Sequence, residues 1–148
     1  NDQEIWKYGN FEAKVIHIPG HTLGHVCFYF YKESSVFTGD TLFSLGCGKI
    51  FEGTYAQMFN SLMKLKALPK NTKIFCGHEY TKQNSKFCIT HDKNNEKLKA
   101  KILDIDIKLK KGLSTLPSTI QDELDCNVFL RSNNIETFSK LRDLKDNS

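Results

Sequence analysis

The sequence is poor in the features that mark specialised protein classes. Its 5 cysteines are odd in number and form no Cys-x-x-Cys pair, which argues against a disulfide framework and a thiolate zinc site. The longest strongly apolar run, Val26 to Tyr31, falls far short of the roughly 20 residues needed to cross a bilayer. We therefore expect a reducing, cytoplasmic location and no membrane partner. An organellar location stays open, because the chain starts at Asn1 rather than Met.

The chain also has no large excess of charge of one sign. The 148 residues carry a formal net charge of +4, and the lysines are interleaved with Asp, Glu and Asn. No block of the chain predicts a nucleic-acid or membrane-binding patch, and a small anionic substrate suits this surface better. The sequence leaves the oligomeric state undetermined.

The first half of the chain, to about Gly77, has the pattern of a sheet. Runs of β-branched and aromatic residues predict strands at residues 5–8, 11–18, 26–31, 35–38 and 73–76. Gly9-Asn10 is typical of a hairpin turn. Apolar residues at helical spacing from Tyr55 to Leu68 predict one helix, which Pro69 ends. The order strand, helix, strand predicts an α/β (α+β) fold with helices on at least one face of the sheet.

The second half is expected to be helical. An apolar stripe from Leu98 to Leu109 lies on a lysine-rich segment that stops at Gly112. Residues 118–121 have a capping-box pattern that predicts a short helix after Pro117. Phe138, Leu141 and Leu144 predict a weaker last helix.

Three predicted strands run into a glycine and then into a residue that can bind metal. The three pairs are Gly20-His21, Gly39-Asp40 and Gly77-His78. Glycine permits the sharp turn that points the next side chain across the sheet edge. If the three strands are neighbours with the same sense, these side chains converge on one edge. Two imidazoles and a carboxylate suit zinc, iron or manganese and leave positions for water.

Each pair also has a simpler interpretation. A single Gly-Asp after a strand is usually a turn, and a single Gly-His usually has no function. The recurrence favours the metal site. His25, which opens the next strand, is expected to support the site through a hydrogen bond rather than to bind metal. His17 and His91 are expected to be a strand side chain and a surface side chain.

Several short motifs form a set that resembles a known family. They are Pro19–His25, Thr38–Phe43, Gly46–Lys49, Glu52–Thr54, Cys76–Tyr80 and Asn127–Arg131. The first two, with Gly77-His78, resemble the metallo-β-lactamase superfamily in general. The others narrow the resemblance to the hydroxyacylglutathione hydrolases, or glyoxalase II. The resemblance extends from about Val15 to Arg131.

The resemblance implies a fold and a reaction. The fold is an αββα sandwich followed by a helical domain, so residues 1–80 would be the second half of the catalytic domain and residues 81–148 the helical substrate-binding domain. The reaction is hydrolysis of S-D-lactoylglutathione to glutathione and D-lactate by a metal-bound hydroxide at a binuclear site.

The resemblance also assigns metal ligands. His21 matches a ligand of the first metal, Asp40 the carboxylate that bridges both, and His78 a ligand of the second. The other four ligands of the family come from a His-x-His-x-Asp-His motif that this chain lacks. We therefore expect an N-terminally truncated fragment whose two divalent ions, zinc before iron or manganese, are incompletely held or absent.

Substrate contacts follow from the same resemblance. Lys49 and Arg131 match basic positions that hold glutathione carboxylates, while Tyr80 and Asn84 match contacts to the tripeptide backbone. Phe51 stands where the animal enzymes carry Tyr, and no second base follows Arg131. A substrate built on a thiol carrier other than glutathione is therefore an open alternative. Without the resemblance, Lys49 and Arg131 would be interpreted as solvated surface charges.

Two other functions remain open from sequence. The superfamily motifs do not distinguish a thioester hydrolase from another hydrolase or a persulfide dioxygenase, although the helical tail with Arg131 argues against these. The alternative from a different class is that the isolated chain is a non-catalytic fragment, since four ligands are missing and half a sheet would expose apolar edges.

Overall fold

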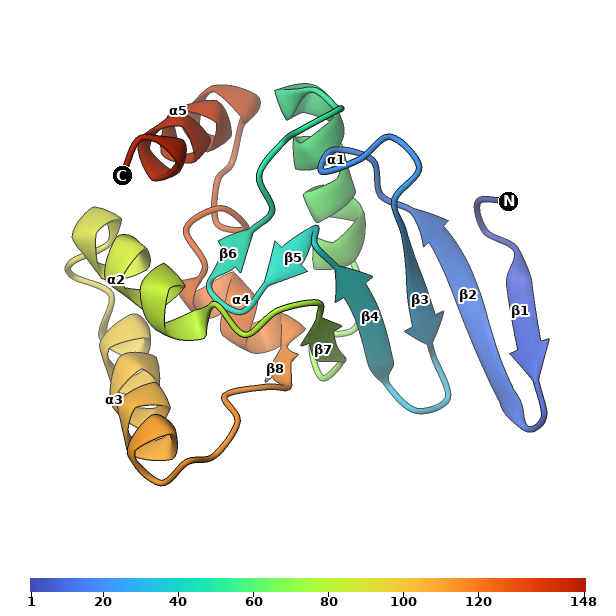
Figure 1. Cartoon of the computed structure of the whole chain (residues 1–148), viewed down its shortest axis with the longest axis horizontal. Coiled ribbons are helices and arrows are strands. Elements are labelled where there is room, and N and C mark those ends of the chain that lie inside the picture. Colours follow the sequence, from blue (N-terminus) through green and yellow to red (C-terminus); the bar gives the residue numbers. More distant parts are fainter.

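A mixed sheet with helices on one face and at one end forms the molecule (Figure 1). The computed structural model describes all 148 residues. The main sheet has the order β1-β2-β3-β4-β7-β8. Its strands are β1 (Ile5–Tyr8), β2 (Phe11–His17), β3 (Val26–Phe30), β4 (Ser35–Gly39), β7 (Lys73–Cys76) and β8 (Ser118–Thr119). A separate small sheet pairs β5 (Leu42–Phe43) with β6 (Gly46–Cys47). The helices are α1 (Tyr55–Lys66), α2 (Thr81–His91), α3 (Glu96–Lys110), α4 (Ile120–Cys126) and α5 (Ile135–Asp146).

Strand direction decides which loops share an edge of the sheet. β1 to β4 form an antiparallel meander, and β4 pairs in parallel with β7 after the crossover through α1. β2, β4 and β7 therefore run in the same sense, as the metal-site argument needs. They are not all neighbours, however, because β3 lies between β2 and β4. The loop after β2 must span this extra strand to bring its residues to the others.

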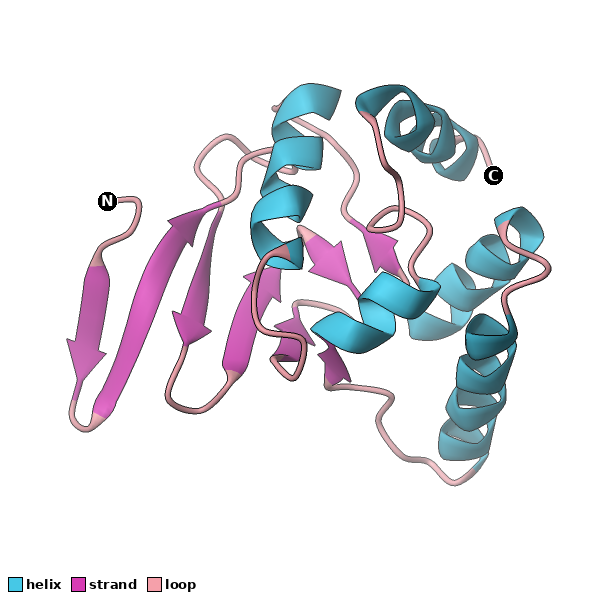
Figure 2. Ribbon diagram, turned by 180° about the vertical axis from the view of Figure 1, so that it is seen from behind, coloured by secondary structure: helices cyan, strands magenta, loops and turns pink.

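Helix α1 covers one face of the sheet. Thr54 caps its N-terminus: the Thr54 hydroxyl accepts the Gln57 amide hydrogen, and the Gln57 side chain accepts the Thr54 amide hydrogen. Met58, Leu62 and Leu65 are fully buried in the core that also contains Val36 and Ile74 of the sheet. Seen from behind, α1 lies in front of the sheet (Figure 2).

The opposite face of the sheet is also apolar and remains open. Side chains alternate along a strand, so Cys27 and Val36 are buried beneath α1 while Phe28 and Phe37 point the other way and are 36% and 47% exposed. A hollow of about 390 Å³ lies on this aromatic face, lined by Trp6, Tyr8, Phe11, Phe30, Glu33, Ser35, Phe37 and Phe75. A sheet with two apolar faces is typical of one covered on both sides.

The second half contains more helix than expected and one extra strand. α2 was not predicted. Helix α4 begins one residue later than the capping-box pattern suggests, with Thr119 rather than Ser118 accepting the N-cap hydrogen bond. The reason is that Ser118 and Thr119 pair with β7 as strand β8. The division at residue 80 stays a prediction. No helix of the chain is long and apolar enough to span a membrane.

Candidate metal centre and substrate cleft

Asp40 lies between two imidazoles at one edge of the sheet. Its Oδ2 atom is 3.6 Å from His21 Nε2, and its Oδ1 atom is 3.5 Å from His78 Nε2. Each imidazole thus faces a different carboxylate oxygen. No three His, Cys, Asp or Glu side chains surround one common point as a single-ion site would need. The three side chains meet in pairs, with one imidazole at each oxygen of Asp40.

Two glycines make this close approach possible. Gly39 has φ of +54°, a conformation that side chains with a Cβ adopt at a cost. A Cβ at Gly39 would lie 2.4 Å from His25 Nε2, and one at Gly77 would lie 2.6 Å from Asp40 Oδ1. Glycine is therefore required at position 39 by the His25 ring and at position 77 by the Asp40 carboxylate.

Main-chain contacts orient the rings. His21 Nδ1 is 2.7 Å from the Lys49 carbonyl oxygen, so we assign the Nδ1 hydrogen to that bond, which leaves the Nε2 lone pair facing Asp40. The Asp40 amide donates to His25 Nε2 at 3.2 Å. His25 thus holds the backbone of Asp40 and does not face its carboxylate. His78 is stacked on Tyr80, with ring centroids 5.0 Å apart.

One oxygen of the Asp40 carboxylate is left without a hydrogen bond. Oδ1 is buried and makes no hydrogen bond. Burying an unpaired carboxylate oxygen is costly, and a bound cation removes that cost. The lone pairs of His21 and His78 on either side complete a donor set that divalent zinc, iron and manganese accept.

A cleft lies beside the three candidate metal ligands. It measures about 180 Å³ and is lined by Phe43, Cys47, Lys49, Tyr80, Gln83, Asn84, Arg142 and Lys145. Three of the predicted substrate-binding residues, Lys49, Tyr80 and Asn84, are among them. Three cationic side chains line one small cleft, which makes it suited to an anionic ligand.

Arg142 and Lys145 are the charged cleft residues that the sequence did not reveal. Arg142 is buried, donates from Nη1 to the Cys47 carbonyl at 2.7 Å, and donates from Nη2 to Asp146 at 2.7 Å. Burial alone would lower the pKa of Arg142, but its contacts with Cys47 and Asp146 raise it. Burial and the Arg142 charge lower the pKa of Lys145. The available signal was their i,i+3 spacing, which places both on one side of α5.

Phe51 and Asn84 have different positions around the site. Phe51 is 67% exposed, its ring lies 5.1 Å from that of His21, and Lys49 Nζ lies 5.8 Å from its centroid. Asn84 is buried and donates from Nδ2 to the Ser44 carbonyl at 3.1 Å. Its amide nitrogen is therefore already engaged within the protein.

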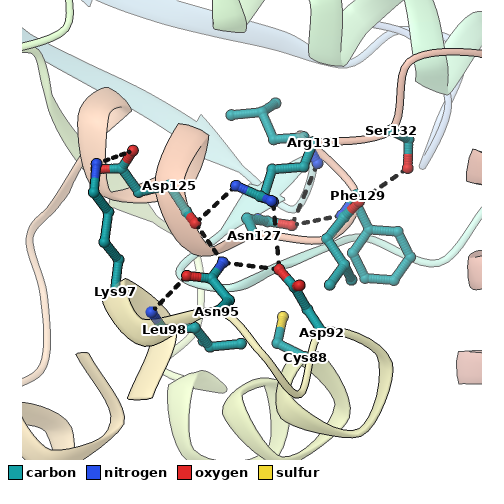
Figure 3. A network of polar contacts seen from close by, with 12 residues as sticks. Cys88, Asp92, Asn95, Lys97, Leu98, Asp125, Asn127, Phe129, Arg131 and Ser132 are labelled. Atoms are coloured by element: carbon teal, nitrogen blue, oxygen red, sulfur yellow. Dashed lines mark hydrogen bonds and ion pairs between the residues drawn. The ribbon is translucent and has the colours of Figure 1, made fainter. Parts of the chain in front are cut away.

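Arg131 is not brought to the cleft. Its Nη1 donates to the Asp125 carbonyl at 3.1 Å, and its Nε lies 3.4 Å from Asp92 Oδ2 (Figure 3). Asn95 ties the same two partners together by donating to the Asp92 carboxylate and the Asp125 carbonyl. In this structure Arg131 joins the turn after α2 to the end of α4, beside a different hollow.

Models of known families match both halves of the chain. Residues 9–78 match the model of the metallo-beta-lactamase superfamily, and residues 79–148 match that of the hydroxyacylglutathione hydrolase C-terminus. The chain is 75% identical over 146 residues to a hydroxyacylglutathione hydrolase of Pelagibacter ubique, covering 99% of this chain and 61% of that protein. It is 49% identical to the one of Rhodospirillum rubrum, covering 86% of this chain and 50% of that protein.

Solved structures support the fold. The crystal structure of ETHE1 from Myxococcus xanthus matches 97% of this chain and 50% of its own, with a TM-score of 0.68 and 23% identity. The BLEG-1 B3 metallo-beta-lactamase matches 89% of this chain and 47% of its own, with a TM-score of 0.61 and 24% identity. At this identity the likeness concerns the fold alone. The two halves of the chain thus match the metallo-β-lactamase superfamily and the hydroxyacylglutathione hydrolase C-terminus, and the chain, which spans between half and about three fifths of those two curated relatives, is similar to the hydroxyacylglutathione hydrolases.

Proposed function

We propose that the full-length protein containing this chain hydrolyses S-D-lactoylglutathione to glutathione and D-lactate. The observation that carries the proposal is the Asp40 carboxylate, flanked by two imidazoles and with an unpaired buried oxygen, next to a cationic cleft. The names of the relatives support the same reaction. A metal centre beside a cleft for an anionic ligand is the arrangement that hydrolysis of a glutathione thioester needs.

His21, Asp40 and His78 are the residues of this chain that would hold two divalent ions, which we propose to be zinc, with iron or manganese as alternatives. Such ions lower the pKa of coordinated water from about 15.7 toward 7 and so supply a nucleophile at neutral pH. His21 is oriented for this role by its hydrogen bond to Lys49. His25 holds the Asp40 main chain.

The cleft residues would bind the thiol carrier. We assign the glutathione carboxylates to Lys49, Arg142 and Lys145, because these cations line one hollow. Tyr80 and Asn84 would contact the peptide part, and Phe51 would offer an apolar surface beside His21. The leaving thiol has a pKa near 8.5, so it departs as a thiolate without a general acid.

Residues 1–80 would then supply the metal ligands and residues 81–148 much of the substrate cleft. We propose the cytoplasm as the compartment, because all 5 cysteines are free thiols.

A second proposal concerns the chain by itself. We infer that the isolated 148 residues are inactive, because the aromatic face of the sheet is open and the chain spans 61% of the Pelagibacter relative. Fewer ligands than a binuclear centre requires are available from His21, Asp40 and His78 alone.

The test compares this chain with a form extended upstream to the length of its relatives. Metal content and hydrolysis of S-D-lactoylglutathione are measured for both, with the extended Asp40→Ala variant as the control. We expect two metal ions and turnover in the extended form only. Absence of turnover in a folded, metal-loaded extended form would refute the reaction. Undiminished turnover by the short chain would refute its inactivity.

A further inference from the structure

The short turn between β5 and β6 is held in a strained conformation next to the metal-binding residues. Leu45, at its centre, has φ of +60° and is fully buried. A residue with a Cβ adopts this conformation at an energetic cost, so it persists only where its surroundings impose it. The contacts that hold this turn therefore matter for whatever the turn positions.

Four side chains from the second half of the chain hold this turn, and one of them is Cys88, whose Sγ donates to the Leu45 carbonyl at 3.1 Å. Glu123 Oε1 accepts the Leu45 amide hydrogen at 2.6 Å, and Asn127 Nδ2 donates to the Gly46 carbonyl at 3.1 Å. Asn84 donates to the Ser44 carbonyl. Every one of these bonds is made to the main chain of the turn, so together they fix its path and not its side chains.

Glu123 is an unusual residue for this task. It is fully buried on α4, and its hydrogen-bond partners are the Leu45 amide, the Ser118 hydroxyl at 2.5 Å and Asn127 Nδ2 at 3.0 Å. No cation hydrogen-bonds to it, and burying an acid without one is costly. The Glu123 carboxylate accepts hydrogen bonds from three converging donors, which an apolar side chain would leave unpaired.

The turn leads directly to the ring of His21. Strand β6 continues into Gly48, whose amide donates to the Thr41 carbonyl at 3.0 Å, and then into Lys49. The Lys49 carbonyl is the acceptor that fixes the Nδ1 hydrogen of His21. The position of the turn therefore sets which nitrogen of His21 faces Asp40.

We propose that Glu123 is a positioning residue for the metal centre, which acts through the Leu45 turn and the Lys49 carbonyl to hold His21 in one tautomer. The inference rests on the proposed function, because it assumes that His21 binds a metal ion. Groups that support a ligand in this way typically change metal affinity about 10-fold or more when removed.

The test uses the full-length protein that contains this chain, freed of metal with a chelator. The readouts are the ¹⁵N shifts of the His21 ring, which report its tautomer, and the affinity for Zn²⁺ added alone. Glu123→Met removes the carboxylate acceptor at similar side-chain volume, whereas Glu123→Gln keeps one acceptor oxygen. Glu12→Gln, which removes a hydrogen-bonded carboxylate of β2, is the matched control.

We expect Glu123→Met to mix the His21 tautomers and weaken zinc binding about 10-fold. Glu123→Gln and Glu12→Gln should stay within about twofold of the parent protein, since the first keeps the acceptor and the second is remote. If Glu123→Met does not fold, Asn127→Ala, which frees the Gly46 carbonyl, decides by the same readouts.

Unchanged His21 shifts and zinc affinity in a folded Glu123→Met or Asn127→Ala variant would overturn the inference. A Glu123→Gln variant as impaired as Glu123→Met would overturn it too, since acceptor geometry would then not be the cause. Thioester turnover is measured separately. Its absence in the parent protein would count against the proposed function, while the tautomer and zinc data would still decide the role of Glu123.

Discussion

Asp40 and His78 come together because the strands that precede them pair in parallel. In this pairing Gly39 lies opposite Cys76, with a register shift after Phe37. Strands β4 and β7 therefore end at the same level of the sheet. Asp40 Oδ1 and His78 Nε2 are consequently 3.5 Å apart. The crossover through α1 thus joins distant segments into one half of the candidate metal centre.

Asp40→Asn should remove metal from both positions. The substitution keeps the shape of the side chain but removes the charge that faces His21 and His78. We expect metal content in the full-length protein to fall from two ions to less than one, and kcat to fall at least about 100-fold. Elemental analysis and a thioester assay measure the two effects. Asp92→Asn, a carboxylate outside the site, should change neither.

Lys145→Ala should weaken substrate binding with little effect on chemistry. The Lys145 ammonium lines the cleft and contacts no reacting atom in the proposed mechanism. Losing one charge-assisted contact of about 1.5–3 kcal/mol corresponds to an increase in KM of about 10-fold or more. Steady-state kinetics on S-D-lactoylglutathione give the split between KM and kcat. Lys110→Ala, an exposed lysine at the end of α3, is the control, and an equal KM for both variants would contradict this assignment.

Arg131→Ala separates two interpretations of the same residue. The sequence predicts a rise in KM, whereas the contacts with Asp92 and the Asp125 carbonyl predict a loss of stability. Because the side chain is 44% exposed, that loss should be only about 1 kcal/mol. Urea unfolding and KM are measured on the same preparation. A raised KM at unchanged stability would restore the sequence-based assignment.

Five strands of the main sheet, β1 to β4 and β7, were predictable, because local signals and the fold agree there. β-branched and aromatic runs end at glycines, and α1 has both a capping box and a terminating Pro69. Helix α2 escaped prediction because several of its buried residues, among them Thr81, Asn84 and Ser85, are polar and give no apolar stripe. Strands β5, β6 and β8 have two residues each and are created by tertiary pairing.

The candidate site was predictable only in part, for a similar reason. Glycine followed by a ligand is a local pattern, so His21, Asp40 and His78 can be found from sequence. Arg142 and Lys145 look like ordinary charges on an exposed helix until the packing of α5 brings them to the cleft. Arg131 lies in a recognisable motif, but the fold places its side chain against Asp92 and away from the cleft.

Glu12→Gln should make the stability of the protein less dependent on acid pH. The Tyr31 hydroxyl and then Lys32 donate to the Glu12 carboxylate, and they lower its pKa from 4.5 to about 2. Because the folded-state pKa lies below the unfolded value, this contribution is complete above pH 4.5 and is lost as the pH falls toward 2. The unfolding free energy of the parent protein should therefore exceed that of Glu12→Gln at pH 6, and the difference should shrink through this window. Urea titrations at several pH values measure it, and Tyr31→Phe should reduce the same difference. A gap between parent and Glu12→Gln that stays constant from pH 6 to pH 2 would show that the hydrogen bonds to Glu12 do not favour its charged form.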